Sequence, residues 1–165
     1  MSKNSDKGHR ASASQFFVAG ELCRRGHMAV VTMGNSPTTD ILCSNKDGSK
    51  CVHIQVKTFV PGTRKCAVGL KAETNPGPNF FWVLAGIPEA DSTKPFEYYI
   101  IPSKVMAPNI KKCFERWKTT PGKKGKRRNQ DSAFRAVRLP PANNLNGWNV
   151  SEYKDAWKLI EDRLK

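Results

Sequence analysis

An Asp-Gly pair between two β-rich segments is the feature that most constrains the fold of this chain. Asp47-Gly48 lies within residues 45–49, a composition typical of a hairpin loop. The segment that follows, 51–59, is rich in Val, Ile and Thr and alternates in part between apolar and polar residues, as strands do. We therefore predict a hairpin in which a strand over 40–43 pairs with the strand over 51–59.

Helical and strand patterns alternate around this hairpin. Ser12 and Gln15 have capping-box spacing, and the apolar period that follows predicts a helix ending at Gly26. Further strands are expected at 28–33, 67–70, 80–85, 97–101 and 134–139, and helical segments at 102–108, 109–117 and 151–164. This order predicts the α/β class, with a mixed central sheet flanked by helices.

The length of 165 residues favours one domain, which we place at 12–165. Residues 1–11 are polar and basic and are expected to form a disordered tail, and 118–131 a basic loop inside the domain. No run of 18 apolar residues exists and the start of the chain lacks the apolar core of a signal peptide, so we expect a cytoplasmic protein without a membrane partner. The five scattered cysteines fit reduced thiols.

Four polar residues carry the candidate chemistry. Gln55 and Lys57 are two positions apart on the predicted strand, so their side chains leave the same face. Asp40 starts the strand that pairs with it, which places Asp40 near both. Glu21 lies on the preceding helix. Taken singly, each of these residues is more often a solvated helix, turn or strand residue, and only their order gives them weight.

This arrangement resembles the PD-(D/E)XK superfamily of restriction-endonuclease-like nucleases, which includes restriction enzymes and archaeal Holliday-junction resolvases. The matching segments are Gly-Glu at 20–21, Pro-Thr-Thr-Asp at 37–40 and Ile-Gln-Val-Lys-Thr at 54–58. Two details depart from the motif. Two residues separate Pro37 from Asp40, and Gln55 stands where the family usually has Asp or Glu, although glutamine variants occur in the superfamily.

The resemblance implies a single restriction-endonuclease-like domain with a catalytic centre of Asp40, Gln55, Lys57 and Glu21. Glu21, Asp40 and the Gln55 amide oxygen would then hold Mg²⁺ or Mn²⁺, hard cations that prefer oxygen ligands. Two neighbouring carboxylates would keep Lys57 charged, which suits stabilisation of the transition state for phosphodiester hydrolysis. The implied function is a metal-dependent DNA endonuclease, and a homodimer is one arrangement that such nucleases use.

The charge of the chain also favours DNA. The sequence has 28 Lys and Arg against 14 acidic residues, a formal net charge of +14, and such an excess attracts a polyanion. An association with the nucleoid is therefore expected. Nine of the basic residues lie between 111 and 128, where they can follow a phosphate backbone, although a solvated loop or a localisation signal has the same composition. The residues we expect to bind DNA are Lys123, Lys124, Lys126, Arg127 and Arg128.

Two other functions remain open on the sequence. A nuclease-fold module without activity would bind DNA or a protein partner, with Gln55 marking the loss of a strong metal site. A basic RNA-binding or ribosome-associated protein would explain the charge but would leave the order of Glu21, Asp40, Gln55 and Lys57 unexplained.

Overall fold

The computed structural model describes residues 3–33, 36–122 and 125–165, and its strands form two sheets. The elements in chain order are α1 (Lys3–Arg24), β1 (Met28–Val31), β2 (Ile41–Ser44), β3 (Cys51–Phe59), β4 (Lys65–Ala67), η1 (Leu70–Glu73), β5 (Phe80–Gly86), β6 (Glu97–Pro102), α2 (Ser103–Thr119), β7 (Ala136–Arg138), η3 (Ser151–Tyr153) and α3 (Lys158–Glu161).

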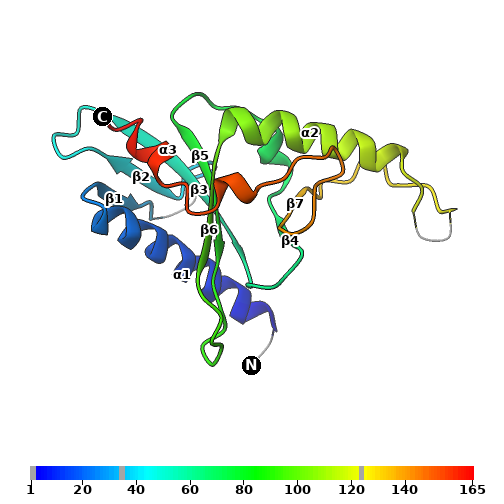
Figure 1. Ribbon diagram of the computed structural model, residues 1–165, viewed down its shortest axis with the longest axis horizontal. Helices are drawn as coiled ribbons and strands as arrows, with labels where there is room; N and C mark the ends of the chain where they lie inside the picture. Colours follow the sequence, from blue (N-terminus) through cyan, green and yellow to red (C-terminus); the bar gives the residue numbers. More distant parts are fainter. Residues whose placement is uncertain (1–2, 34–35, 123–124) are drawn as a thin grey trace.

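The larger sheet has five strands in the order β1-β2-β3-β5-β6, and it is mixed because β3 and β5 run parallel while the other neighbours are antiparallel. On one face, α1 and α3 bury an apolar cluster that includes Leu22, Ile54 and Trp157. On the other face, α2 and the β4–β7 ribbon cover a second cluster that includes Trp82 and Met106. Figure 1 shows α1 and α2 on opposite sides of the central strands. The expected α/β class with helices flanking a mixed sheet is confirmed.

The hairpin is formed as expected. β2 and β3 pair antiparallel from Ile41 opposite Ile54 to Ser44 opposite Cys51, and β3 has the bounds that its composition predicts. Buried residues of β3 alternate between the two clusters: Val52, Ile54 and Val56 face α1, whereas Phe59 belongs to the α2 side. This alternation fixes the face from which every candidate side chain of β3 leaves the sheet.

The start of α1 differs from the prediction, whereas its end agrees with it. It begins at Lys3, so the expectation of a disordered tail over 1–11 is wrong for the residues from Lys3 onward. The physical reason is that 3–11 contain no proline, and one glycine, Gly8, is too small a penalty to stop a helix. The helix ends before Gly26, where the amides of Gly26 and His27 bond to Cys23 and Leu22 in the pattern of a Schellman motif.

Helix α2 is continuous through Pro108, so the expected break into 102–108 and 109–117 is wrong. Pro108 lies in the second turn of the helix and has no amide hydrogen to donate to the Lys104 carbonyl. Because Lys104 is exposed, water can donate a hydrogen bond to that carbonyl instead. The Asn109 side chain meanwhile donates to the Val105 carbonyl at 2.9 Å.

The chain beyond α2 differs from expectation in two places. β7 is shorter than the expected 134–139, and β4 lies earlier than the expected 67–70 and shares only Ala67 with it; the two strands pair with each other. The single helix expected over 151–164 is instead η3 and α3, because Asp155 adopts a positive φ of 51° and donates its amide to the Tyr98 carbonyl. Trp157, Ile160 and Leu164 still form the buried face.

Candidate active site

Asp40 directly precedes the first residue of β2, at the point where β3 extends beyond its pairing with β2. The Asp40 amide donates to the Ile54 carbonyl at 2.9 Å, which holds Asp40 beside β3. Its Oδ2 atom accepts a hydrogen bond from the Val56 amide at 2.7 Å and a second one from the Gln55 side chain. The carboxylate therefore takes the place that a β2 residue would have occupied in the ladder, and it is fixed there.

The structure brings Gln55 to this carboxylate, as the hairpin predicts. Gln55 is 8% exposed, and its amide nitrogen donates to Asp40 Oδ2. A carboxylate at position 55 would place two negative charges in contact in a poorly hydrated position, which is costly without a cation. A neutral amide avoids this repulsion. Because an amide also carries an oxygen, Gln55 can turn that oxygen toward a cation.

Lys57 leaves β3 on the same face as Gln55, one pleat along the strand. It pairs in register with Leu84 of β5, as Gln55 does with Trp82, and both partners belong to the α2-side cluster. Lys57 is half-buried, and it has no ion pair within the described residues. Burial raises the pKa of the neighbouring Cys66 thiol to about 12, and the Lys57 charge acts against this rise.

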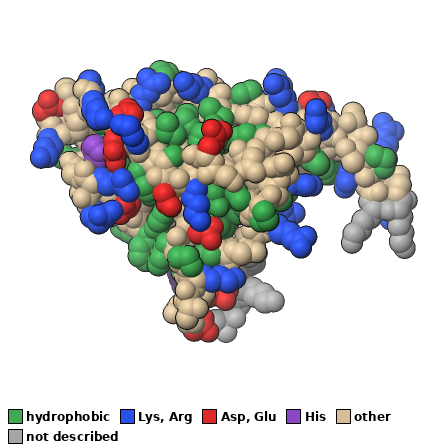
Figure 2. All heavy atoms as spheres, in the orientation of Figure 1, with side chains coloured by type: hydrophobic (Ala, Val, Ile, Leu, Met, Phe, Trp, Pro, Cys, Tyr) green, Lys and Arg blue, Asp and Glu red, His purple; other side chains and the backbone are tan. Residues whose placement is uncertain are grey.

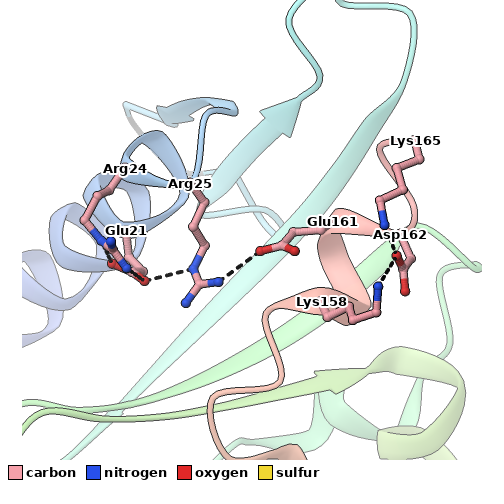
Figure 3. A network of polar contacts seen from close by, with 7 residues as sticks. All are labelled: Glu21, Arg24, Arg25, Lys158, Glu161, Asp162 and Lys165. Atoms are coloured by element: carbon pink, nitrogen blue, oxygen red, sulfur yellow. Dashed lines mark hydrogen bonds and ion pairs between the residues drawn. The ribbon is translucent and has the colours of Figure 1, made fainter.

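Glu21 is held elsewhere. Its carboxylate accepts hydrogen bonds from Arg24 at 2.7 Å and Arg25 at 2.8 Å, and Arg25 also pairs with Glu161 of α3 at 2.9 Å (Figure 3). The hydrogen bond from Arg24, and after it that from Arg25, lowers the pKa of Glu21. Within the described residues, the Glu21 carboxylate thus bonds to Arg24 and Arg25 and has no hydrogen bond or ion pair with Asp40, Gln55 or Lys57.

The two faces of the central sheet explain this arrangement: α1 packs on the face that carries Ile54 and Val56, whereas Gln55 and Lys57 leave β3 on the α2 side. α1 meets the far end of β3 through Ser14, whose hydroxyl lies 2.7 Å from that of Thr58. Ser14 donates to the Ala11 carbonyl at 2.7 Å, so Thr58 must donate to Ser14. Ser14 is 1% exposed, and this buried polar contact on the α1 side of β3 was not among the expected site residues.

Asp40 and Gln55 are suitable ligands for Mg²⁺. The residues at 3–33, 36–122 and 125–165 contain no group of three His, Cys, Asp or Glu side chains that could hold a metal. Mg²⁺, however, often binds proteins through only one or two carboxylates and completes its shell with water and substrate phosphate oxygens. One carboxylate and one amide oxygen on a fixed strand edge satisfy that requirement.

The basic segment after α2 is described only in part, because Lys123 and Lys124 lie outside the described residues. Lys126 and Arg127 are exposed. Arg128 is instead tied to the segment: it donates to the carbonyls of Thr120 and Pro121, and its guanidinium lies 5.0 Å from the centre of the Trp117 ring. Figure 2 shows Lys and Arg side chains over the visible face and at the projecting end of α2.

In the described part of the chain, no helix is both long enough and apolar enough to cross a membrane. The sequence matches no family model and no curated protein. Among solved structures, the chain is similar to that of a bacterial homing endonuclease, I-Ssp6803I, with a TM-score of 0.54 and 14% identity over 93% of this chain and 91% of the other. At this identity the likeness is one of fold, and it extends over nearly the whole of both chains.

Proposed function

We propose that this protein is a magnesium-dependent DNA endonuclease whose centre is formed by Asp40, Gln55 and Lys57. The observation that carries the proposal is the Asp40 carboxylate held by Gln55 where β3 extends beyond its pairing with β2, with Lys57 on the same face as Gln55. The fold shared with a homing endonuclease and the net charge of +14 support DNA as the substrate.

Each residue has a defined task in this proposal. Asp40 and the Gln55 amide oxygen would hold Mg²⁺, which when bound polarises a phosphate and lowers the pKa of a water molecule. Lys57 positions its ammonium group beside the scissile phosphate and neutralises the negative charge that grows as the phosphorus–oxygen bond breaks. The Val56 amide fixes Asp40 so that the carboxylate needs no reorganisation. We assign Glu21 to the network with Arg24 and Arg25, and not to the metal.

The test is cleavage of supercoiled, linear and branched DNA with Mg²⁺ or Mn²⁺ by the wild-type protein and by Lys57→Ala. Because Lys57 acts in the transition state, its loss should lower the cleavage rate by about 100-fold or more, while metal and DNA binding stay within about twofold. Lys50→Ala, a change of an exposed lysine in the hairpin, is the matched control and should cut normally. Cleavage by Lys57→Ala at the wild-type rate would refute this role.

A nuclease-fold module without activity is the second candidate, and Gln55 is the observation that favours it. An amide oxygen offers a dipole where a carboxylate offers a full charge, so Asp40 alone supplies charge to the cation. Such a protein would bind DNA in the same assays and cut none of the three substrates.

A further inference from the structure

A second feature, separate from Asp40 and Gln55, is a cavity of about 220 Å³ between α2 and the β4–β7 ribbon. Its walls combine aromatic rings with cations, a combination that the proposed metal centre does not use. Pockets for drug-sized ligands measure about 300–1,000 Å³, so this one suits a single ring system. The lining residues used below are Lys65, Phe114, Trp117, Phe134, Arg135 and Arg138.

Two like charges stand directly opposite each other at this cavity. Lys65 of β4 is paired in register with Arg138 of β7, while their neighbours Cys66 and Val137 are buried, so both cations leave the ribbon on the face opposite to these two buried side chains. Neither has an acidic partner within the described ranges. Like charges in this position weaken a ribbon. An anion between them would remove the repulsion, so the arrangement points to an anionic ligand.

The aromatic rings of the cavity divide into covered and open ones. Phe114 stacks with Trp117 at 5.6 Å, and the Arg135 guanidinium lies 3.2 Å from the Phe114 ring centre. Arg135 is fixed in turn by Glu73 and by the Ser132 carbonyl, so this wall is formed in advance. Phe134 differs: it is 56% exposed, and its one cationic neighbour, Lys65, lies 5.4 Å from the ring centre.

We infer that this cavity binds one unpaired nucleotide of DNA, with its phosphate between Lys65 and Arg138 and its base stacked on Phe134. An open aromatic ring beside paired cations is the combination by which proteins hold single-stranded nucleic acid. The inference rests on the proposed function for the choice of DNA. β4 lies beside the far end of β3, since Cys66 Sγ is 3.9 Å from the Thr58 carbonyl. The cavity is therefore next to the strand that carries Lys57, and one DNA molecule can reach both. The substrate class that we infer is DNA in which unpaired nucleotides adjoin a duplex.

The experiment compares the affinities of the full chain for two DNA hairpins, measured by fluorescence anisotropy without divalent metal. One hairpin is blunt, and the other has the same duplex with a three-nucleotide thymidine overhang. The wild type should favour the overhang. Phe134→Ala should reduce that preference about fivefold or more while leaving the affinity for the blunt duplex unchanged. Phe134→Trp should retain it, because the ring is kept. Phe96→Ala, which removes another exposed ring, should also retain it.

Lys65 and Arg138 provide a second, independent test of the inference. Lys65→Gln with Arg138→Gln should lower the salt dependence of overhang binding, since each lost phosphate contact flattens the slope by about 0.7. Thymidine monophosphate added as a competitor should displace the overhang from the wild type and not from the double variant. The inference is overturned if Phe134→Ala keeps the preference or weakens both hairpins equally. Cleavage of a blunt duplex reports on the proposed function separately, because that duplex offers the cavity no unpaired base.

Discussion

The two faces of the central sheet differ in how many of their charged side chains have a partner of opposite charge. On the α1–α3 face, Glu21 is paired with Arg24 and Arg25, and Arg25 also holds Glu161. On the α2 face, Lys57, Lys65 and Arg138 lack acidic partners within the described residues. Arg135 on the same side does pair with Glu73. Charges that satisfy one another stabilise the protein as it stands, whereas charges held apart from any partner are available to a ligand. The second face is therefore the one to which we assign DNA.

The largest effect that separates the two faces is expected at Asp40. Asp40→Asn should abolish detectable Mg²⁺ binding, because it removes the negative charge that holds the cation, and should cost little stability, because an amide oxygen can still accept from the Val56 amide. Asp40→Ala should abolish Mg²⁺ binding too, and should lower the free energy of unfolding by about 1–3 kcal/mol, because that amide loses its acceptor. Titration calorimetry with Mg²⁺ and urea denaturation provide the two measurements.

Glu21→Gln is the control for this pair of variants. It should bind Mg²⁺ as the wild type does, since its carboxylate lies in the arginine network. Loss of Mg²⁺ binding in Glu21→Gln would place Glu21 in the metal site. The assignment of the metal to the α2 face alone would then be wrong.

A smaller effect is expected in the basic segment after α2. Replacing both Lys126 and Arg127 with Ala should weaken binding to unrelated duplexes to the same extent and reduce the slope of log affinity against log salt by about two, since each contact contributes about 0.9. The matched control replaces Lys46 and Lys50, an exposed basic pair in the β2–β3 hairpin. Dissociation constants measured over a range of salt concentrations test this. Equal slopes in the wild type and the Lys126/Arg127 variant would show that these side chains do not contact phosphates.

The smallest effect is the stability that Glu21 contributes. Because Arg24 and Arg25 lower the pKa of Glu21 below its ordinary value of 4.5, the contribution is complete above about pH 4.5 and is lost as pH falls through the lowered value. Glu21→Gln should reduce the free energy of unfolding by less than about 1 kcal/mol at pH 7. In thermal melting this is less than about 4 °C, and the difference from the wild type should shrink at pH 3. If the difference in melting temperature between the two proteins grew toward low pH, the pKa of Glu21 would be raised and not lowered in the folded state.

Local signals predicted the part of the site that is close in sequence. The Asp-Gly loop fixed the pairing of β2 with β3, and the pleat then placed Gln55 and Lys57 on one face with Asp40 beside them. Each of these steps depends on contacts between residues fewer than 20 positions apart. The strand β3 itself is marked by β-branched residues at every second position, a pattern typical of a strand with one buried face: Val52, Ile54, Val56 and Thr58.

Features that depend on contacts between residues far apart in the sequence were not predicted. Glu21 has the right order in the chain, but α1 packs on the face of the sheet opposite to the α2 side, and Arg24 and Arg25 hold the Glu21 carboxylate there. The split of the last helix requires Tyr98, more than 50 residues away. Lys65 and Arg138 face each other only because β4 pairs with β7, and neither strand has more than three residues to show its pattern in the sequence.

The most direct test of the account is the rate of DNA cleavage with Mg²⁺ for the wild type, Gln55→Glu and Gln55→Ala. Gln55 is the one residue whose type departs from a fully acidic metal site, so the account depends on its amide oxygen serving as a ligand. We predict that the wild type cuts DNA, that Gln55→Glu cuts at least as fast because a second charge strengthens the hold on the cation, and that Gln55→Ala is slower by about tenfold or more. If neither the wild type nor Gln55→Glu cuts any of the supercoiled, linear and branched substrates, the protein is a DNA-binding module and the account of the active site is wrong.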